Sequence, residues 1–410
     1  MNEHPEQVTQ EANIVQSYWQ HHRIGPYPVL SGRHHADVAV IGAGYTGSWL
    51  AYWLKDSGLS VVVLERDTPG AGASGRNGGL LLQGAAQLLG ESAQTLGQAV
   101  AVELWQRTRQ TFNWVEELSR RHALDYHVTG SLYVGGDAGE REVLEATVDL
   151  MNQAGVAARL VKRPDQPKSI QRLGYDLAAW FPDDGMVHPL KLIEALLAEA
   201  QAQGVQIYSH SGVVAGTEHS SGVELLGENF SVYADRVLIA QNAYVPDWVP
   251  ALTGLIHPVR GQVLATEPVA PLDHQYPVYA DHGFNYWHQR ADGRIIAGGF
   301  RHLDLTGEVG TELTLHQPIQ ARVTQLVRDL VNGPVTVSDR WAGIMAMTAD
   351  HRPLVGFITP RLGVVMGYSG HGSTVTPIAA RMLKDALVDN TPVFAPFAAE
   401  RMIPPQESST

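Results

Sequence analysis

The residues whose spacing first suggests chemistry are three glycines in a G-x-G-x-x-G pattern and an acidic residue further along the chain. They are Gly42, Gly44, Gly47 and Glu65. The glycines follow an apolar run, Val38–Ile41, and open a helix-like stretch, and Glu65 ends the next apolar run, Val61–Leu64. In such a unit the glycines permit a tight turn, close approach of a pyrophosphate and tight helix–sheet packing, and the acid accepts hydrogen bonds from ribose hydroxyls. The pattern predicts a dinucleotide site, and a tight turn without a ligand is the alternative.

A second glycine-rich stretch, GAGASGRNGG at residues 70–79, follows the acidic strand end. Glycine loses much conformational entropy when it is fixed, so such a cluster indicates backbone that approaches a ligand or adopts angles that other residues avoid. Its N–H groups can donate to a diphosphate, and Arg76 and Asn77 can add side-chain donors. Glu65 disfavours a 2′-phosphate, and NAD-binding folds do not need this second loop. The two stretches together therefore favour FAD, with a flexible surface loop as the alternative for residues 70–79.

Composition limits the class of protein. The chain has 410 residues, of which 44% are hydrophobic and 17% charged, as expected of one large or two medium folded domains. Its formal net charge of −13 argues against nucleic acid or an anionic membrane as the main partner. The absence of cysteine excludes disulfides, a thiolate nucleophile and cysteine-ligated metal. With a polar N-terminus and no long apolar run, we expect a cytoplasmic protein without a signal peptide or membrane insertion.

Hydrophobic patterning places the two motifs on an α/β scaffold. The predicted strands lie in residues 38–41, 61–64, 126–136, 205–218 and 235–244, and residues 256–300 are rich in strands. One predicted helix follows Gly44, one spans residues 92–122, one starts at His188 and ends near Gly204, and one covers residues 316–332. Residues 362–387 are predicted to form a last strand, turn and helix. Residues 1–36 are expected to form an arm with turns, and the tail PPQESST, residues 404–410, is expected to be disordered.

Several motifs together resemble those of the FAD-dependent amine and amino-acid oxidases of the D-amino-acid oxidase superfamily. They are VIGAGYTG, VVVLER, GASGRNGG and GYSGHG, and with HPL and NAY they resemble in particular the gamma-glutamylputrescine oxidase type. The resemblance covers roughly residues 37–390. It implies an α/β fold with a discontinuous Rossmann-like FAD-binding domain and a substrate domain built on a large mixed β-sheet. The predicted boundaries are 30–90, 150–252 and 338–392 for the FAD-binding domain, 91–149 and 253–337 for the substrate domain, 1–29 for an N-terminal arm and 393–410 for a C-terminal tail.

The resemblance also implies a set of FAD-binding positions. They are Gly42, Gly44, Tyr45, Thr46, Gly47, Glu65, Arg66, Ser74, Arg76, Asn77, Gly78, Gly79, Leu80, Val213, Gly343, Ile344, Gly370, His371, Gly372, Ser373 and Thr374. The first glycine motif would hold the AMP half, residues 74–79 would follow the pyrophosphate toward the flavin, and Val213 would present backbone to the adenine. Residues 370–374 would lie near the flavin pyrimidine edge, where a helix N-terminus suits the negative charge of reduced flavin. The chain lacks cysteine, and ASGRNGG lacks histidine, so we expect FAD to be bound non-covalently.

In this family a hydride leaves the carbon beside a neutral amine and reaches flavin N5, and the imine hydrolyses. Oxygen then accepts the electrons and gives H2O2, or another acceptor takes them. The predicted reaction is oxidation of a primary or secondary amine, gamma-glutamylputrescine or a related one, to an aldehyde. The alternatives are a D-amino-acid or N-methyl-amino-acid dehydrogenase with a non-oxygen acceptor, and a non-catalytic flavoprotein. Ile296 matches a lysine that helps oxygen react in sarcosine oxidases, so oxidase and dehydrogenase both stay open.

The residues predicted at the substrate end are Tyr286, His288, Arg301, Met345 and His371. Amino-acid oxidases of the family have, at the position of Met345, an arginine that clamps the substrate carboxylate. A simple α-amino acid held in that way is therefore not expected, unless Met345 is core packing and the clamp lies elsewhere. Arg301 is a candidate replacement, with a solvated strand-end arginine as the alternative.

Tyr286 and His288 share one face of a strand because side chains alternate along it. With Trp341 they either form an aromatic wall for an ammonium-bearing chain or belong to the sheet core. His371 is either a flavin neighbour or a turn histidine. The pairs at 21–22 and 34–35 have no partner acids in a ligating pattern, so we interpret them as surface residues and expect no metal. The oligomeric state is not predicted.

Overall fold

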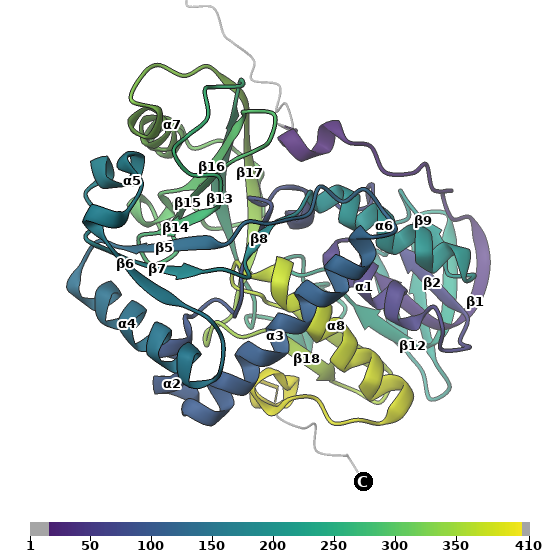
Figure 1. Ribbon diagram of the computed structural model, residues 1–410. Helices are drawn as coiled ribbons and strands as arrows, with labels where there is room; N and C mark the ends of the chain where they lie inside the picture. Colours follow the sequence, from purple (N-terminus) through teal and green to yellow (C-terminus); the bar gives the residue numbers. More distant parts are fainter. Residues whose placement is uncertain (1–15, 404–410) are drawn as a thin grey trace, which may run out of the picture.

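Two large β-sheets lie side by side in the computed structural model, which describes residues 16–403 (Figure 1). The first sheet has the order β10-β11-β12-β1-β2-β9, with β19 beside β12 and β18 beside β19. Its strands are β1 (Gly32–Ile41), β2 (Val61–Leu64), β9 (Gln206–Tyr208), β10 (Ala215–Glu218), β11 (Val223–Leu226), β12 (Phe230–Ile239), β18 (Leu354–Phe357) and β19 (Leu362–Met366). Strands β19, β12, β1, β2 and β9 run parallel, as in a Rossmann-like sheet.

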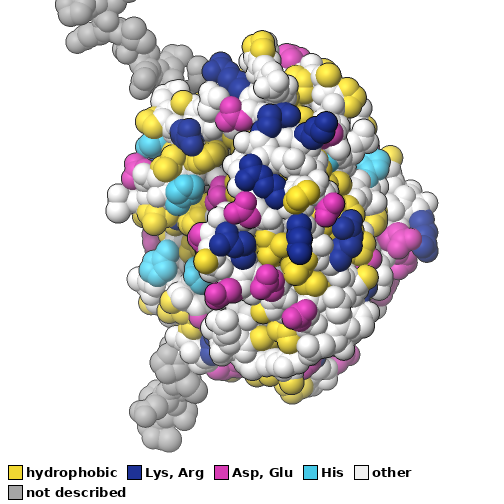
Figure 2. Space-filling view, turned by 60° about the vertical axis from the view of Figure 1, so that its left-hand side comes forward, with side chains coloured by type: hydrophobic (Ala, Val, Ile, Leu, Met, Phe, Trp, Pro, Cys, Tyr) yellow, Lys and Arg dark blue, Asp and Glu magenta, His cyan; other side chains and the backbone are white. Residues whose placement is uncertain are grey.

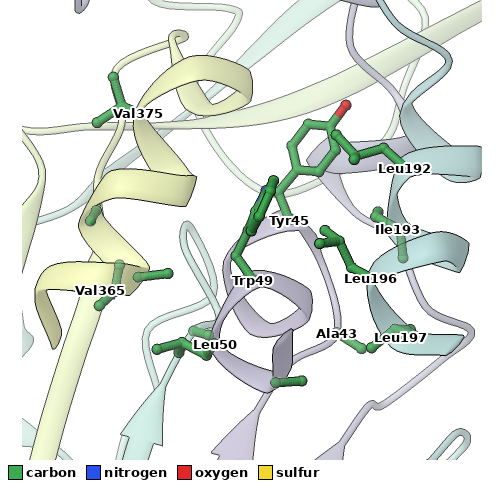
Figure 3. Close-up of a cluster of buried hydrophobic side chains, with 14 of the residues drawn as sticks. Ala43, Tyr45, Trp49, Leu50, Leu192, Ile193, Leu196, Leu197, Val365 and Val375 are labelled. Carbon is green, nitrogen blue, oxygen red and sulfur yellow. The ribbon is translucent and has the colours of Figure 1, made fainter. Parts of the chain in front are cut away.

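Both faces of the parallel strands of the first sheet are apolar, and helices cover one of them while β17 (Val337–Met347) and residues 249–256 pack on the other. Helix α1 (Tyr45–Leu54) links β1 to β2 and packs between α6 (Pro189–Ala202) and α8 (Gly372–Asp389). Figure 3 labels the side chains that meet in this part of the core. They are Ala43, Tyr45, Trp49, Leu50, Leu192, Ile193, Leu196, Leu197, Val365 and Val375. Each fully buried leucine among them stabilises the fold by about 2 kcal/mol, so the start of α1 is held firmly where the first glycine motif ends.

The second sheet is mixed and has the order β17-β13-β16-β15-β14-β5-β7-β6. Its strands are β5 (Ser131–Gly135), β6 (Arg159–Lys162), β7 (Leu177–Phe181), β13 (His257–Thr266), β14 (Val278–Ala280), β15 (Asn285–Gln289), β16 (Ile295–Gly299) and β17 (Val337–Met347). Only the β5–β14 pair of this sheet is parallel. The helices packed on it are α4 (Ala138–Gln153) and α7 (Gln317–Val331), and α5 (Lys168–Leu173) packs against α7.

Shorter elements connect the two sheets. Helices α2 (Leu89–Leu96) and α3 (Gln98–Ser119) run in front of them, where α2 contacts α4 and α3 contacts α8 (Figure 1). A three-stranded sheet has the order β3-β8-β4 and consists of β3 (Leu80–Leu81), β8 (Gly185–Met186) and β4 (His127–Val128). The predicted α/β fold with a large mixed sheet is thus confirmed.

The structure differs from the predicted elements at two places. The helix predicted over residues 92–122 is interrupted at Gly97, whose φ of +81° ends α2 and sets a new direction for α3. The predicted arm is shorter than residues 1–36, because β1 already starts at Gly32 and pairs with β12 from there. The tail at 404–410 and the first fifteen residues lie outside the described part of the chain.

Sheet membership also departs from the predicted division into domains. Strands β6 and β7 lie in the segment assigned to the FAD-binding domain, but they pair with β5 in the second sheet. Strand β17 likewise pairs with β13 in the second sheet, although most of it falls within 338–392. The alternation of a short strand shows that it belongs to a sheet but not to which one. We therefore propose that 159–181 and β17 belong to the substrate domain.

The surface gives little sign of a large single-sign patch on the face drawn in Figure 2, where Lys and Arg side chains are interspersed with Asp and Glu. Between residues 16 and 403, no helix combines the length and the apolar character that crossing a membrane requires.

Candidate active site

One elongated cavity of about 1500 Å³ is lined by residues of both sheets. At one end it is bordered by the turn from β1 to α1, by Glu65 and by residues 240–248. At the other end it is bordered by the turn between β14 and β15, by β17 and by the start of α8. A cavity with this lining joins the predicted dinucleotide site to the predicted substrate site.

The first glycine motif leaves room for a ligand in the way its spacing predicts. Gly42 has a φ of +101°, which side chains rarely adopt. A Cβ atom on Gly44 would lie 2.9 Å from Ser74 Oγ, and a Cβ on Gly47 would overlap the carbonyl oxygen of Gly42. Gly42 and Gly44 line the cavity, whereas Gly47 is covered by the turn. Two glycines thus expose backbone to the cavity and the third permits the helix to pack.

Glu65 joins the turn to the neighbouring loop at the dinucleotide end. Its carboxylate accepts hydrogen bonds from the backbone N–H of Ala43 at 2.8 Å and of Asp67 at 2.9 Å. Burial raises the pKa of Glu65, while these two hydrogen bonds act in the opposite direction. Because Glu65 also lines the cavity, its remaining acceptor capacity faces the space where a ribose would lie.

Residues 70–79, which we call the flavin loop, are held in part by their own side chains. Ser74 Oγ accepts a hydrogen bond from the backbone N–H of Tyr45 at 2.9 Å. Arg76 donates to the carbonyl oxygens of Ala71 at 3.1 Å and Ala342 at 3.3 Å, and its side chain is almost fully buried. The Asn77 amide donates to Ser74 O at 2.8 Å. These side chains order the loop backbone and line the cavity at the same time.

Two of the residues predicted for the aromatic wall bond to the backbone of the flavin loop instead of lining the cavity. The Trp341 indole donates to the carbonyl oxygen of Arg76 at 2.9 Å, and His288 Nε2 lies 2.8 Å from the carbonyl oxygen of Gly78. Both side chains are buried and neither lines the cavity, so an aromatic wall that includes them is wrong. Burial lowers the pKa of His288 to about 4, so it is neutral at neutral pH. The flavin loop covers this face of the sheet.

The aromatic side chains that do line the substrate end include Tyr279, Tyr286 and His371. The two tyrosine rings stack with centroids 6.3 Å apart, and the His371 ring meets Tyr279 edge-on at 5.7 Å. Burial raises the pKa of both tyrosines and lowers the pKa of His371 to about 4. All three side chains are therefore neutral at neutral pH. Sequence reasoning missed Tyr279, although it lies opposite Tyr286 on the paired strand β14.

Arg301 follows β16 and places a guanidinium at the same end of the cavity. Its guanidinium carbon lies 5.3 Å from the centroid of the Phe284 ring, and both residues line the cavity. Within residues 16–403 the guanidinium has no ion pair and no hydrogen bond. The nearby acid Glu308 is already paired with Arg260 at 3.1 Å and with Gln262 at 3.1 Å. Burial lowers the pKa of Arg301, and Glu308 opposes this effect.

Met345 lies on the same side of the second sheet as Arg301. Strand β13 separates their two strands, since it pairs with β17 on one side and with β16 on the other. Both β16 and β17 run antiparallel to β13, so their C-terminal ends lie at the same edge. Adjacent strands are about 4.8 Å apart, so Met345 lies on a strand roughly 10 Å from β16, the strand that Arg301 follows. Met345 lines the cavity and adds no charge to it.

The structure places most of the predicted positions around this cavity. All the predicted FAD-binding residues line it except Gly47 and Gly79, and of the substrate-end residues only His288 does not. The roles of these residues remain proposals. The arm residues that reach the flavin loop were not anticipated, because no local sequence pattern marks them.

The histidine pair at 21–22 lies beside acidic side chains, and His22 also lines the cavity. His21 lies 3.2 Å from Asp339 and His22 2.8 Å from Glu194. Within the described residues, one group has a geometry compatible with a metal, and it consists of Asp137, Glu140 and His282. These side chains bond to one another and to backbone at the start of α4, which explains their proximity without an ion.

Comparison with known proteins identifies the class of the chain. A family model described as "DAO: FAD dependent oxidoreductase" matches residues 37–386, so the chain belongs to this family of FAD-dependent oxidoreductases. The glycine turn, the flavin loop and the cavity fit that cofactor, because glycine backbone, Glu65 and the start of α8 border one continuous cavity. The predictions of the family, of an oxidoreductase and of FAD as cofactor are therefore confirmed.

Individual relatives are more distant. The chain is similar to the probable oxidoreductase OrdL of Rhizobium meliloti, with 27% identity over 360 residues that cover 84% of this chain and 81% of the relative. It is also similar to gamma-glutamylputrescine oxidoreductase of Escherichia coli, with 26% identity over 390 residues that cover 92% and 89%. Among solved structures, glycine oxidase from Geobacillus kaustophilus has a TM-score of 0.75 at 23% identity and covers 90% of this chain and 99% of that chain. The last likeness shows the fold alone.

Proposed function

We propose that the chain oxidises a primary or secondary amine, and that gamma-glutamylputrescine or a closely related amine is its substrate. The observation that carries this proposal is the combination of an uncharged β17 position, Met345, with a cation just after β16, Arg301, that has no ion pair within the described residues. Such a site does not suit a carboxylate clamped from β17. It does suit an amine that carries a carboxylate elsewhere in the molecule, as gamma-glutamylputrescine does. The similarity to gamma-glutamylputrescine oxidoreductase of Escherichia coli supports the same substrate class.

Bound FAD supplies the acceptor for the hydride that leaves the carbon beside the amine nitrogen. The glycine turn and Glu65 would hold the nucleotide half of FAD. The flavin loop and the start of α8 would hold the rest of the cofactor. The N-terminus of α8, which begins at Gly372, presents unpaired backbone N–H groups to the cavity. These N–H groups favour negative charge on a molecule bound at the start of α8. A cationic side chain is not needed there, which is consistent with a neutral His371.

The surrounding side chains orient the amine and keep it uncharged. Tyr279, Tyr286 and His371 form a neutral aromatic surface, which favours the free amine over the ammonium form by excluding water. The amine must be neutral to release a hydride, and loss of its N–H proton then completes the imine. The imine takes up water after it leaves the aromatic surface and gives an aldehyde. No acid or base is required from the chain, since orientation and electrostatics carry the reaction.

A dehydrogenase that acts on an amino acid is the second candidate, and Arg301 is also the observation that favours it. In this case Arg301 would clamp the carboxylate of a D-amino acid or an N-methyl amino acid directly. Electrons would then pass to an acceptor other than oxygen. The two candidates differ in how far the carboxylate lies from the reacting carbon, and in whether air re-oxidises the enzyme.

The test is anaerobic mixing of the purified yellow protein with matched amines, followed by admission of air. The panel contains gamma-glutamylputrescine, its carboxyl amide, putrescine, glycine, D-alanine and sarcosine. We expect gamma-glutamylputrescine to bleach the flavin absorbance fastest, its amide and putrescine to act more slowly, and the amino acids to have no effect. Rapid recovery in air would identify an oxidase. Bleaching by the amino acids alone would overturn the proposal in favour of the dehydrogenase.

A further inference from the structure

The N-terminal arm packs directly on the flavin loop. Its short 3₁₀ helix, Tyr18–His21, lies next to β17 in Figure 1, and His21 is 3.2 Å from Asp339 of that strand. Trp19 on this helix is completely buried although it lies outside both sheets. The arm residues that also line the cavity are Gln16, Gln20, His22, Arg23 and Ile24. The arm is therefore part of the wall around the cofactor site.

Three arm side chains bond to backbone carbonyl oxygens of the loop. Trp19 Nε1 donates to Asn77 O at 2.7 Å, and Gln20 Nε2 donates to Ala71 O at 3.3 Å. The Ser17 hydroxyl donates to the carbonyl oxygen of Gly75. These acceptors span most of the loop. Among the intervening N–H groups, those of Gly75 and Arg76 donate to carbonyl oxygens within the loop, so within the described residues those of 72–74 are the ones left for a diphosphate in the cavity.

Trp19 also determines which residue fits at the end of the loop. A Cβ atom on Gly79 would lie 2.7 Å from the indole ring, and Gly79 has a φ of +73°. Gly79 does not line the cavity, so its side of the loop faces the indole and not the cofactor. The backbone angle already favours glycine at this position, and the indole of the arm leaves no room for a Cβ atom.

The opposite side of the indole is held by residues from both halves of the molecule. The Arg290 guanidinium lies 5.1 Å from the Trp19 ring centroid, and the His188 ring meets the indole edge-on at 5.0 Å. Next to it, Tyr18 Oη lies 3.1 Å from Asp292 Oδ2. His188 precedes α6, and Arg290 and Asp292 follow β15. Trp19 thus adds a contact between the loop and the flanks of α6 and β15, whose Leu190 and Tyr286 also lie against loop glycines.

We propose that Trp19 is a positioning residue for the cofactor: by fixing the backbone of residues 75–79 it holds the flavin loop in the conformation that retains FAD. The cofactor and the arm would then stabilise each other, because both select the same loop conformation. This role of Trp19 does not depend on the proposed substrate, and it holds whichever amine or amino acid the enzyme oxidises.

The experiment compares W19F with W53F in the full-length holoenzyme. Phenylalanine keeps an aromatic ring at position 19 but removes the hydrogen bond to Asn77 O. Trp53 is the matched control, since its indole donates to a carbonyl oxygen, Pro377 O, at 3.1 Å in the same half of the molecule but away from the loop. We expect W19F to release FAD about fivefold faster than the parent, which corresponds to one lost hydrogen bond. W53F should release FAD at the parental rate.

A second measurement uses the unmodified chain and tests the reciprocal effect. Trypsin can cleave after Arg23, which is exposed at the end of the arm. FAD should slow release of this N-terminal peptide by the same mechanism, as followed by mass spectrometry of apoprotein and holoenzyme. Equal FAD release by W19F and W53F, or equal cleavage at Arg23 with and without FAD, would overturn the proposal and leave Trp19 with a purely structural role.

Discussion

The two ends of the cavity use their polar side chains in opposite ways. At the dinucleotide end, Glu65, Ser74 and Asn77 are bonded to the protein backbone, and the ligand meets glycine and N–H groups. At the substrate end, Arg301 has no bonded partner within the described residues, and its side chain faces the cavity. A common cofactor can be recognised by ordered backbone, whereas a particular substrate must be recognised by side chains. The substrate end is therefore where specificity can change without loss of the fold.

The largest expected effect comes from adding a side chain at Gly47, where two backbone segments are in close contact at the dinucleotide end. Gly47→Ala puts a Cβ onto the carbonyl oxygen of Gly42, and the turn cannot yield without moving α1. We expect a loss of stability of more than about 3 kcal/mol and no bound flavin, measured by absorbance at purification and by thermal unfolding. Gly333→Ala is the control, because nothing lies within 4 Å of a Cβ there. A yellow, fully loaded G47A protein would show that this backbone is less constrained than we infer.

The next largest effect is expected from removing the charge of Arg301 at the substrate end of the cavity. Arg301→Gln should lower kcat/KM for an amine with a carboxylate by about 10- to 100-fold, the value of a charge-assisted hydrogen bond. The same variant should leave the carboxyl amide of that amine unaffected. Arg322→Gln is matched to it, since Arg322 also lies 5.3 Å from an aromatic ring, that of Phe300, but does not line the cavity. Equal losses with both amines would mean that Arg301 acts on the fold and not on the carboxylate.

A smaller effect should appear in the pH dependence of stability, through His288. Its pKa is lowered by burial to about 4, against about 6.5 in an unfolded chain. The folded state thus favours the neutral ring, so the stabilisation is complete above pH 6.5 and is lost as the pH falls toward 4. We expect the unfolding free energy of the parent apoprotein to approach that of His288→Gln as the pH is lowered from 7.5 to about 5.

Denaturant unfolding of both apoproteins at several pH values measures this difference. His257→Gln, at an exposed position on β13, should follow the parent at every pH. A gap between parent and His288→Gln that stays constant over this range would contradict a buried, neutral His288.

The smallest effect should follow removal of one hydroxyl that orders the flavin loop. Ser74→Ala leaves the N–H of Tyr45 without its 2.9 Å acceptor, although a bound ligand can replace that acceptor. We expect a loss of about 1 kcal/mol in the apoprotein and a smaller loss in the holoenzyme, measured by thermal unfolding with and without FAD. A larger loss in the holoenzyme would indicate that Ser74 bonds to the cofactor itself.

The sequence predicted the dinucleotide end well because its chemistry is local. The glycine spacing, the adjacent strands and Glu65 lie within one strand–helix–strand unit, and the structure keeps them together. The substrate end was predicted less well because strand alternation shows which side chains share a face but not what covers it. His288 and Trp341 were placed on the correct kind of element, but the flavin loop covers their face of the sheet.

Contacts between distant parts of the chain had no sequence signal at all. Trp19 lies in a polar arm with no periodicity, and its burial depends on the loop and on Arg290, which no local pattern connects to it. The break at Gly97 was missed for a related reason, since a single glycine inside an apolar-periodic stretch does not by itself end a helix.

The packing of the arm also constrains the order in which the molecule can assemble. The arm is made first, but its partners lie far along the chain: Asn77 is 58 residues after Trp19, Glu194 is 172 residues after His22, and Asp292 is 274 residues after Tyr18. Contacts at such separations form slowly and cannot form before the later partner has been synthesised. The arm therefore completes its docking only when most of the chain exists, and until then the flavin loop stays open to the cofactor from outside.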